Sequence, residues 1–350
     1  MNNHIPITLV GFGIAGQILL SYILDLVPGY KVRIIDPDFL GGDLIRHYSG
    51  IFSNTTIGQK LESISKLPGN WSDTISSLKT RGNLDNTIQL SDLVFDMRKS
   101  SGKLSIQCEC IYDKVIRVSW NEEMRIWNLY LQSGVESTTN ILCFCGGMSP
   151  RQNDYGIPII PLAIAIDKVH LSHIIKKGQS VLVIGSAHSA TLVLKNLNNI
   201  PDINATCIYR GSNPFKYARD NEYDGIKKES ADIADAIKSG VYTNLSLVNA
   251  IDLPNISKAL RDADWVIQAT GFVGRFPEIF IGNTRITPTW DSITGIAKEL
   301  PQVQAFGACL PSTTCINEIV YPDISLGSFV EQIEKRWPLL KLTIQNQNLV

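Results

Sequence analysis

The chain has 350 residues, of which 44% are hydrophobic and 19% are charged, a composition typical of a folded globular protein and not of a disordered one. Its formal net charge of −1 argues against nucleic acid or an anionic membrane as a partner, because excess lysine and arginine hold such partners, so small-molecule ligands are expected. The length suits two domains, or one domain with a second inserted into it.

The start of the chain and its cysteines indicate a cytoplasmic protein. No apolar run reaches the roughly 18 residues that a membrane span requires. Residues 1–6 lack the basic start and apolar core of a signal peptide. The seven cysteines contain no C-x-x-C pair, which is poor material for a disulfide framework or a zinc site. We therefore expect ordinary thiols and no metal site.

The first predicted element is a buried strand over 7–10 that enters the glycine turn G-F-G-I-A-G. Gly11 would make the tight turn, and Gly13 would let phosphates approach the backbone. Gly16 would let the following helix lie close to the strand. This is how an α/β sheet presents backbone N–H groups to a pyrophosphate.

A second strand over 31–35 ends in Asp36, 25 residues after Gly11, where an acid would accept hydrogen bonds from an adenosine ribose. Strand, glycines, helix, strand and terminal acid together predict a site for an ADP-containing cofactor. The alternative is a structural βαβ unit.

Little periodicity follows over 41–56, and a long loop inside a compact domain is usually functional, although a surface connection is the alternative. Helical patterns are expected over 61–98, with a break at 68–70, and a β-meander is expected over 105–131. A strand over 140–145 then ends in two glycines, the first of which is Gly146.

The opening motif recurs over 180–190, where alanines replace the second and third glycines of the turn. The next strand ends at Arg210, 25 residues after Gly185, so a guanidinium takes the place that Asp36 has in the first repeat. An arginine there suits the 2′-phosphate of NADPH, and a solvated arginine at a strand end is the alternative.

The second repeat closes with a strand over 265–269 and the turn Thr270-Gly271-Phe272, the counterpart of 145–147. After Pro288 the chain is expected to return to the first domain and to end in a helix over 327–337. We predict an α/β fold with two Rossmann-like dinucleotide-binding domains, the second inserted in the first. The predicted segments are 1–155 for the first part, 156–287 for the insertion and 288–350 for the return.

This arrangement resembles the flavoproteins with two dinucleotide domains, which include thioredoxin-reductase-like enzymes and flavin-containing monooxygenases. The resemblance implies FAD in the first domain and NADPH in the inserted one. It implies that FAD is bound by Gly11, Gly13, Gly16 and Asp36, and NADPH by Gly185, Ser186, Ser189 and Arg210. The predicted cofactor-binding set is completed by Ile14, Ala15, Gly42, Asp43, Asn54, Thr55, Gly146, Ala187, Thr270 and Gly271.

Within that group the sequence favours the monooxygenases. The disulfide reductases need a C-x-x-C or an equivalent cysteine pair beside the flavin, and the chain has none. Residues 41–55 resemble the monooxygenase stretch of paired glycines, a tyrosine and an Asn-Thr pair, here Asn54 and Thr55. The resemblance implies that Asn54 lies by the reactive edge of the flavin, with its amide placed to hydrogen-bond a flavin peroxide, and makes it the candidate catalytic residue.

The resulting hypothesis is an FAD- and NADPH-dependent monooxygenase that uses O2 to oxygenate a nitrogen or sulfur nucleophile through a flavin hydroperoxide. One alternative is an NADPH-dependent flavin reductase or oxidase without oxygen transfer. Another is a cofactor-binding protein with weak catalysis. The substrate's identity and the formation of a homo-oligomer stay open.

Overall fold

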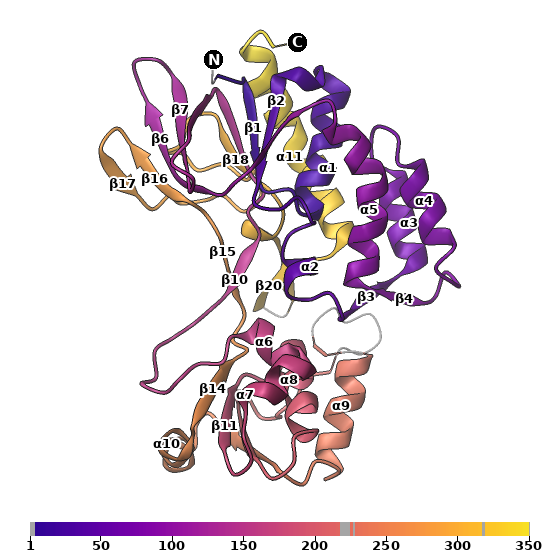
Figure 1. The fold of residues 1–350 in the computed structure, drawn as a ribbon, viewed down its shortest axis with the longest axis vertical. Helices are drawn as coiled ribbons and strands as arrows, with labels where there is room; N and C mark the ends of the chain where they lie inside the picture. The colour runs from indigo at the N-terminus through magenta and orange to yellow at the C-terminus, as the bar shows by residue number, and fades with distance from the viewer. Residues whose placement is uncertain (1–3, 218–224, 227, 317–318, 350) are drawn as a thin grey trace. The chain divides into compact units, whose positions relative to one another are not determined.

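The computed structural model describes residues 4–217, 225–226, 228–316 and 319–349, and the chain divides into two compact units (Figure 1). Unit 1 comprises Met1–Met148 and Gly274–Val350, and unit 2 is Ser149–Val273. The fold is α/β, with one parallel sheet in each unit, as predicted.

The boundaries between the two units lie at positions that differ from the predicted ones. Residues 149–155 belong to unit 2, and 274–287 belong to unit 1. The reason for the second difference is β16 (Glu278–Ile281), which pairs in parallel with β6 (Val115–Asn121) of unit 1. No turn signal in the sequence marks that pairing, because it joins segments far apart along the chain.

Unit 1 is organised around a five-stranded parallel sheet. Its order is β18 (Val303–Ala305), β9 (Ile141–Phe144), β1 (Ile7–Val10), β2 (Val32–Asp36) and β5 (Glu109–Tyr112). The short apolar strands are buried in the middle of the unit, as parallel strands generally are.

The two faces of this sheet have separate cores, because successive side chains of a strand point to opposite faces. Ile34 and Cys143 belong to a core shared with a layer of helices, whereas Ile35 and Phe144 belong to a core shared with the β6–β7 strands. Unit 1 therefore has three layers, visible in Figure 1. The helices of this layer include α1 (Ile14–Leu26), α5 (Leu90–Ser105) and α11 (Leu326–Asn346). The other sheet has the order β17 (Thr284–Ile286), β16, β6, β7 (Ile126–Leu131) and β8 (Glu136–Thr139).

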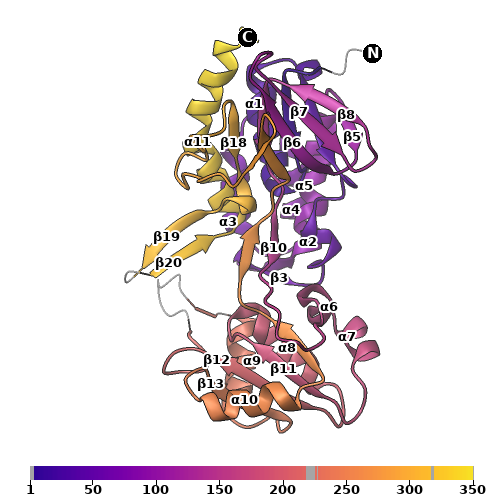
Figure 2. The same cartoon turned by 90° about the vertical axis from the view of Figure 1, so that its left-hand side faces the viewer.

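Unit 2 repeats the parallel sheet on a smaller scale. Four parallel strands lie in the order β13 (Leu245–Asn249), β12 (Asn204–Tyr209), β11 (Ser180–Ile184) and β14 (Trp265–Gln268). Figure 2 shows β13, β12 and β11 with α8, α9 and α10 around them. These helices are α8 (His188–Asn198), α9 (Glu229–Lys238) and α10 (Leu253–Asp262). Two shorter helices of the unit, α6 (Leu162–Ile166) and α7 (Lys168–Ile174), precede β11.

The predicted meander over 105–131 is wrong at its start. Ser105 ends α5, and Ile106 is the C-cap residue of that helix, with 83% of its surface exposed. The next strand, β5, pairs with β2 in the parallel sheet instead of with β6. The meander itself begins at β6 and continues through β7 and β8.

The last helix is longer than the predicted 327–337. It runs on past Pro338 to Asn346, because Leu340 and Ile344 continue its buried face. Burial of those two side chains outweighs the single backbone hydrogen bond that a proline removes.

The connection between β2 and α5 contains short elements. They are α2 (Asp43–Arg46), β3 (Phe52–Thr56), α3 (Ile57–Ser65), α4 (Ser72–Lys79) and β4 (Thr87–Gln89). The helices predicted over 61–98 and the break at 68–70 are confirmed for α3, α4 and α5, but residues 80–89 are not helical and include β4.

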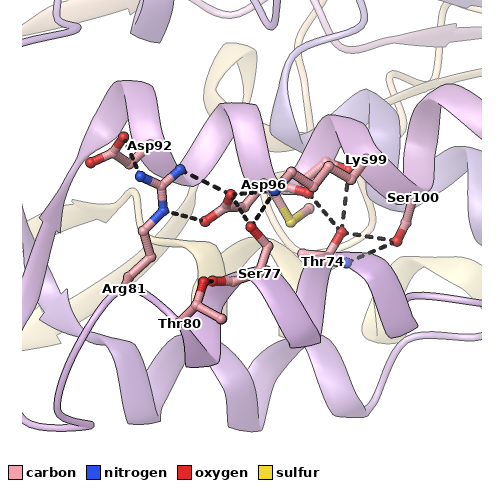
Figure 3. A network of polar contacts seen from close by, with 9 residues as sticks. Thr74, Ser77, Thr80, Arg81, Asp92, Asp96, Lys99 and Ser100 are labelled. Atoms are coloured by element: carbon pink, nitrogen blue, oxygen red, sulfur yellow. Dashed lines mark hydrogen bonds and ion pairs between the residues drawn. The ribbon is translucent and has the colours of Figure 1, made fainter.

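A buried polar network fixes α4 against α5 (Figure 3). The fully buried Asp96 carboxylate accepts hydrogen bonds from Ser77 Oγ (2.6 Å) and from Arg81 Nε (3.0 Å) and Nη2 (3.1 Å). Farther along the interface, Thr74 Oγ1 donates to the Asp96 carbonyl (2.8 Å) and lies 2.9 Å from Ser100 Oγ. These contacts hold two helices together at positions where apolar packing alone would leave polar atoms without partners.

The two carboxylates that bind Arg81 should differ sharply in their contribution to stability. Asp96→Asn should lower the free energy of unfolding by about 2 kcal/mol, because it removes charge-assisted bonds at a buried site. Asp92→Asn is the matched control, since Asp92 also pairs with Arg81 (2.9 Å) but has a side chain that is 37% exposed, and it should cost less than about 0.5 kcal/mol. Urea unfolding measures both values, and equal losses would contradict the role assigned to burial.

Candidate dinucleotide sites

The glycine turn after β1 is packed too closely for side chains at two of its positions. Gly11 has a φ of +99°, and its N–H donates to the carbonyl of Ile35 (2.9 Å). A Cβ on Gly11 would lie 2.5 Å from the carbonyl oxygen of Cys145, and one on Gly16 would lie 2.3 Å from that of Gly11. Both glycines are therefore required by the packing of the turn against β9 and α1.

Gly13 is different, because the space beside it is open. The nearest atom to a Cβ built there is the carbonyl oxygen of Gly41 at 3.8 Å. Gly13 is the N-cap residue of α1, and the first turn of this helix holds Ile14, Ala15 and Gly16. Among the described residues no side chain caps the helix, and its first turn contains no acid. A phosphate at this position would satisfy the helix's first N–H groups.

Asp36 lies at the end of β2 as predicted, but its carboxylate already organises the turn. It is 3% exposed and accepts the N–H groups of Phe12 (2.7 Å), Phe39 (2.8 Å) and Asp38 (3.1 Å). A carboxylate offers about four acceptor positions, so one is left for a ribose hydroxyl. The sequence did not indicate that this acid also shapes the protein's own backbone.

The turn after β2 lies against the glycine turn, and a distant arginine holds it there. Gly42 would place a Cβ 3.6 Å from the Cα atom of Gly13. The next residue, Asp43, forms an ion pair with Arg275, whose Nε also donates to the Gly146 carbonyl (2.9 Å). The contact of Arg275 with Asp43 was not predicted from the sequence, because the two residues lie 232 positions apart. The arginine thus joins the turns that follow β2 and β9.

Asn54 and Thr55 lie on β3, which is at the same end of unit 1 as α2 in both views (Figures 1 and 2). The Asn54 side chain is exposed, whereas Ser53 is buried and Thr55 is half-buried. Asn54 is therefore available to a ligand at this end of the unit.

The turn of unit 2 has the same geometry as that of unit 1. Gly185 has a φ of +111°, its N–H donates to the Ile208 carbonyl (2.9 Å), and a Cβ there would lie 2.4 Å from the carbonyl oxygen of Ala269. The turn continues through Ser186 and Ala187, and α8 begins at His188, so Ser189 is in its first turn. Within the part of the chain that the structure describes, no side chain caps α8.

The other predicted residues of unit 2 lie at the ends of neighbouring strands. Arg210 directly follows β12 and is exposed. Thr270 and Gly271 follow β14, and the Gly271 carbonyl accepts the N–H of Arg151 (2.9 Å). β12 and β14 flank β11 on its two sides, so these residues border the Gly185 turn.

Comparison with solved structures identifies this arrangement. The chain superimposes on a flavin-containing monooxygenase from Stenotrophomonas maltophilia with a TM-score of 0.66 and 15% identity, covering 99% of this chain and 100% of that one. The bacillithiol disulfide reductase Bdr of Staphylococcus aureus gives a TM-score of 0.61 at 10% identity, covering 99% of each chain. The chain has the fold of the flavin-containing monooxygenases and related disulfide reductases.

Two further comparisons, one in structure and one in sequence, give an N-hydroxylase and a monooxygenase as similar proteins. An ornithine N-hydroxylase from Kutzneria sp. 744, in a structure with reduced FAD, NADP+ and L-ornithine, has a TM-score of 0.62 and 11% identity, covering 97% of this chain and 99% of that one. In sequence, the chain is 24% identical over 264 residues to the monooxygenase AgnR1 of Paecilomyces divaricatus. That match covers 64% of this chain and 65% of the relative, so the chain spans about two thirds of the relative's length. No protein-family profile matches the chain.

The thiols of this chain are poorly suited to disulfide exchange. Six of the seven cysteines have described side chains, and all six are free. Burial raises the pKa of Cys309 to about 11 and that of Cys207 to about 12, and it raises the pKa of Cys145 still further. Such thiols stay protonated at neutral pH, whereas exchange requires the thiolate.

In the described part of the chain, no helix has the length and apolar character needed to cross a membrane.

The open space at Gly13 provides a test that separates ligand binding from packing. Gly13→Ala should weaken FAD binding by at least about tenfold, because the methyl group would occupy the space through which a phosphate reaches the backbone. The Gly13→Ala variant should have the same midpoint of urea unfolding as the wild type. Fluorescence titration of the protein with FAD, after removal of any bound cofactor, measures the affinity.

Gly16→Ala is the matched control, because its methyl group would collide with the Gly11 carbonyl. It should lose about 3 kcal/mol of unfolding free energy through overpacking. Unchanged FAD affinity in a folded Gly13→Ala variant would remove the turn of unit 1 from the cofactor site.

Proposed function

We propose that this protein is an FAD- and NADPH-dependent monooxygenase that oxygenates a nitrogen or sulfur nucleophile of a small molecule. The observation that carries the proposal is the glycine turn built twice with one geometry. Gly11 and Gly185 each have a positive φ, donate to the neighbouring strand and precede a helix that no described side chain caps. Two such helix N-termini suit two dinucleotides, and the ornithine N-hydroxylase of the same fold holds FAD and NADP+.

The residues of unit 1 would hold FAD through backbone groups. The first turn of α1, with Gly13 beside it, would bind the pyrophosphate, and Asp36 would accept a ribose hydroxyl. Arg275 and Asp43 would keep the adjacent turns in place. Bound FAD would supply electron transfer from NADPH and the activation of O2, and Asn54 would donate or accept hydrogen bonds at the reactive edge of the ring.

Two observations support oxygen transfer over disulfide reduction. The cysteines with described side chains have raised pKa values or lie buried, so a reactive dithiol is not among them. The curated relative in sequence is a monooxygenase. The likeness to the disulfide reductase Bdr concerns the fold, at 10% identity.

Purified protein tests the proposal directly. We expect a flavin absorption band near ~450 nm, a property of the cofactor, that bleaches with NADPH under anaerobic conditions. In air, an amine or thiol substrate from a panel should accelerate NADPH oxidation and yield less H2O2 than NADPH consumed. Fast H2O2 release that no amine or thiol alters would favour the flavin oxidase or reductase. Failure of excess NADPH to bleach bound flavin would favour a cofactor-binding protein.

We assign the preference for NADPH over NADH to Arg210. Arg210→Ala should raise the KM for NADPH by about tenfold and leave that for NADH nearly unchanged, because only NADPH has the 2′-phosphate that a guanidinium binds. Arg261→Ala is the control, since Arg261 is another exposed arginine of unit 2 and lies at the end of α10. Steady-state NADPH and NADH oxidation measures both constants. Equal effects of Arg210→Ala on the two coenzymes would refute the assignment.

A further inference from the structure

We propose that Lys60 is a positioning residue that fixes the backbone of residues 53–56 and so determines where Asn54 points. The role of Asn54 rests on the proposed function, but the contacts of Lys60 do not. Lys60 lies on α3, is 1% exposed, and is one of the largest fully buried side chains of the described chain.

The ammonium group of Lys60 binds the segment on either side of Asn54. Its Nζ lies 2.6 Å from Ser53 Oγ and 2.9 Å from Thr55 Oγ1, and it also donates to the Thr55 carbonyl. The Ser53 hydroxyl donates to the same Thr55 carbonyl (2.8 Å). These contacts form a closed ring of hydrogen bonds that joins the residues on either side of Asn54.

Alternation along the strand explains how this ring can orient Asn54. Residues two apart in a strand point to the same face, and Ser53 and Thr55 both contact Lys60. Asn54 lies between them, and its side chain is exposed. Lys60 therefore binds one face of the segment, and Asn54 projects from the other.

The segment needs this support because its strand pairing is interrupted. Phe52 pairs with Gln89 and Thr56 pairs with Thr87, so three residues of β3 face one residue of β4. Bulges of this kind re-aim side chains and are common beside active sites. The carbonyl of Thr55 lies inside the bulge and accepts from Lys60.

Neither the helix dipole nor burial favours a lysine at this position. Thr56 is the N-cap residue of α3 and closes a capping box with Gln59, which places Lys60 at the end of the first helical turn. A cation there faces the positive end of the helix dipole, and burial adds a desolvation cost. An apolar side chain of similar length would avoid both costs, so the benefit of Lys60 lies in the oxygens that it binds.

Hydrogen–deuterium exchange of the full chain tests the positioning role without any activity. Lys60→Met keeps the length of the side chain and removes its donors, so amides of residues 53–57 should exchange at least about tenfold faster. Lys66→Met is the matched control, because Lys66 is the C-cap residue of the same helix and its side chain is 50% exposed. Its exchange should equal that of the wild type. Ser53→Ala removes one acceptor and should give a smaller increase, which keeps the test available if Lys60→Met does not fold.

A double-mutant cycle tests the link to Asn54. With NADPH in air and no substrate, Asn54→Ala should release H2O2 at least about threefold faster per bound FAD than the wild type, and Lys60→Met should match it. The double variant should be no faster than Asn54→Ala alone, because Lys60 acts through Asn54. A purely structural lysine would not produce that non-additivity.

The outcomes separate the two proposals. Unchanged exchange in Lys60→Met and Ser53→Ala would overturn the positioning role. Faster exchange with additive peroxide rates would overturn the link to Asn54. A wild-type protein that does not oxidise NADPH would end the proposed function, and the exchange data would still decide what Lys60 holds.

Discussion

The close approach of Gly11 to the carbonyl of Cys145 is the constraint on which unit 1 depends. β1 and β9 are adjacent parallel strands. Gly11, which follows β1, must therefore pass beside the carbonyl of Cys145, which follows β9. Only a residue without a Cβ fits there, and its positive φ turns the backbone into α1. Unit 2 meets the same constraint between Gly185 and Ala269. This one contact places both helix N-termini at the carboxyl ends of the central strands β1 and β11.

Features governed by local sequence could be predicted for that reason. A positive φ needs glycine, a buried parallel strand needs an apolar run, and the spacing from each glycine turn to Asp36 or Arg210 follows from one βαβ unit. Contacts between distant segments could not be predicted, and Arg275 with Asp43 is the clearest example. The longer α11 was missed because tertiary burial overrode a proline signal.

Lys60 could be predicted in part from the sequence, because its position in α3 is a local signal that its side chain is buried. It follows the buried Ile57 by three residues and precedes the buried Ile64 by four, so it occupies the apolar stripe of α3. A lysine in such a stripe must either reach solvent or find buried oxygens. The sequence alone could raise that question, but Ser53 and Thr55 could be identified as its acceptors only from the fold.

Lys60, Arg275 and Arg336 share one physical task in unit 1, which is to donate hydrogen bonds to backbone carbonyls in turns, at strand ends and in the bulged strand β3. Lys60 donates to Thr55, Arg275 donates to Gly146, and the buried Arg336 donates to the carbonyls of Ala305 (2.6 Å) and Leu310 (3.2 Å). Burial lowers the pKa of Arg336 to about 10, which still leaves it charged at neutral pH. Buried carbonyls must have partners, so cationic side chains take the place of a sheet where the backbone is irregular. The loops at the candidate site can thereby keep a defined shape without regular secondary structure, and this is why their conformation depends on distant residues.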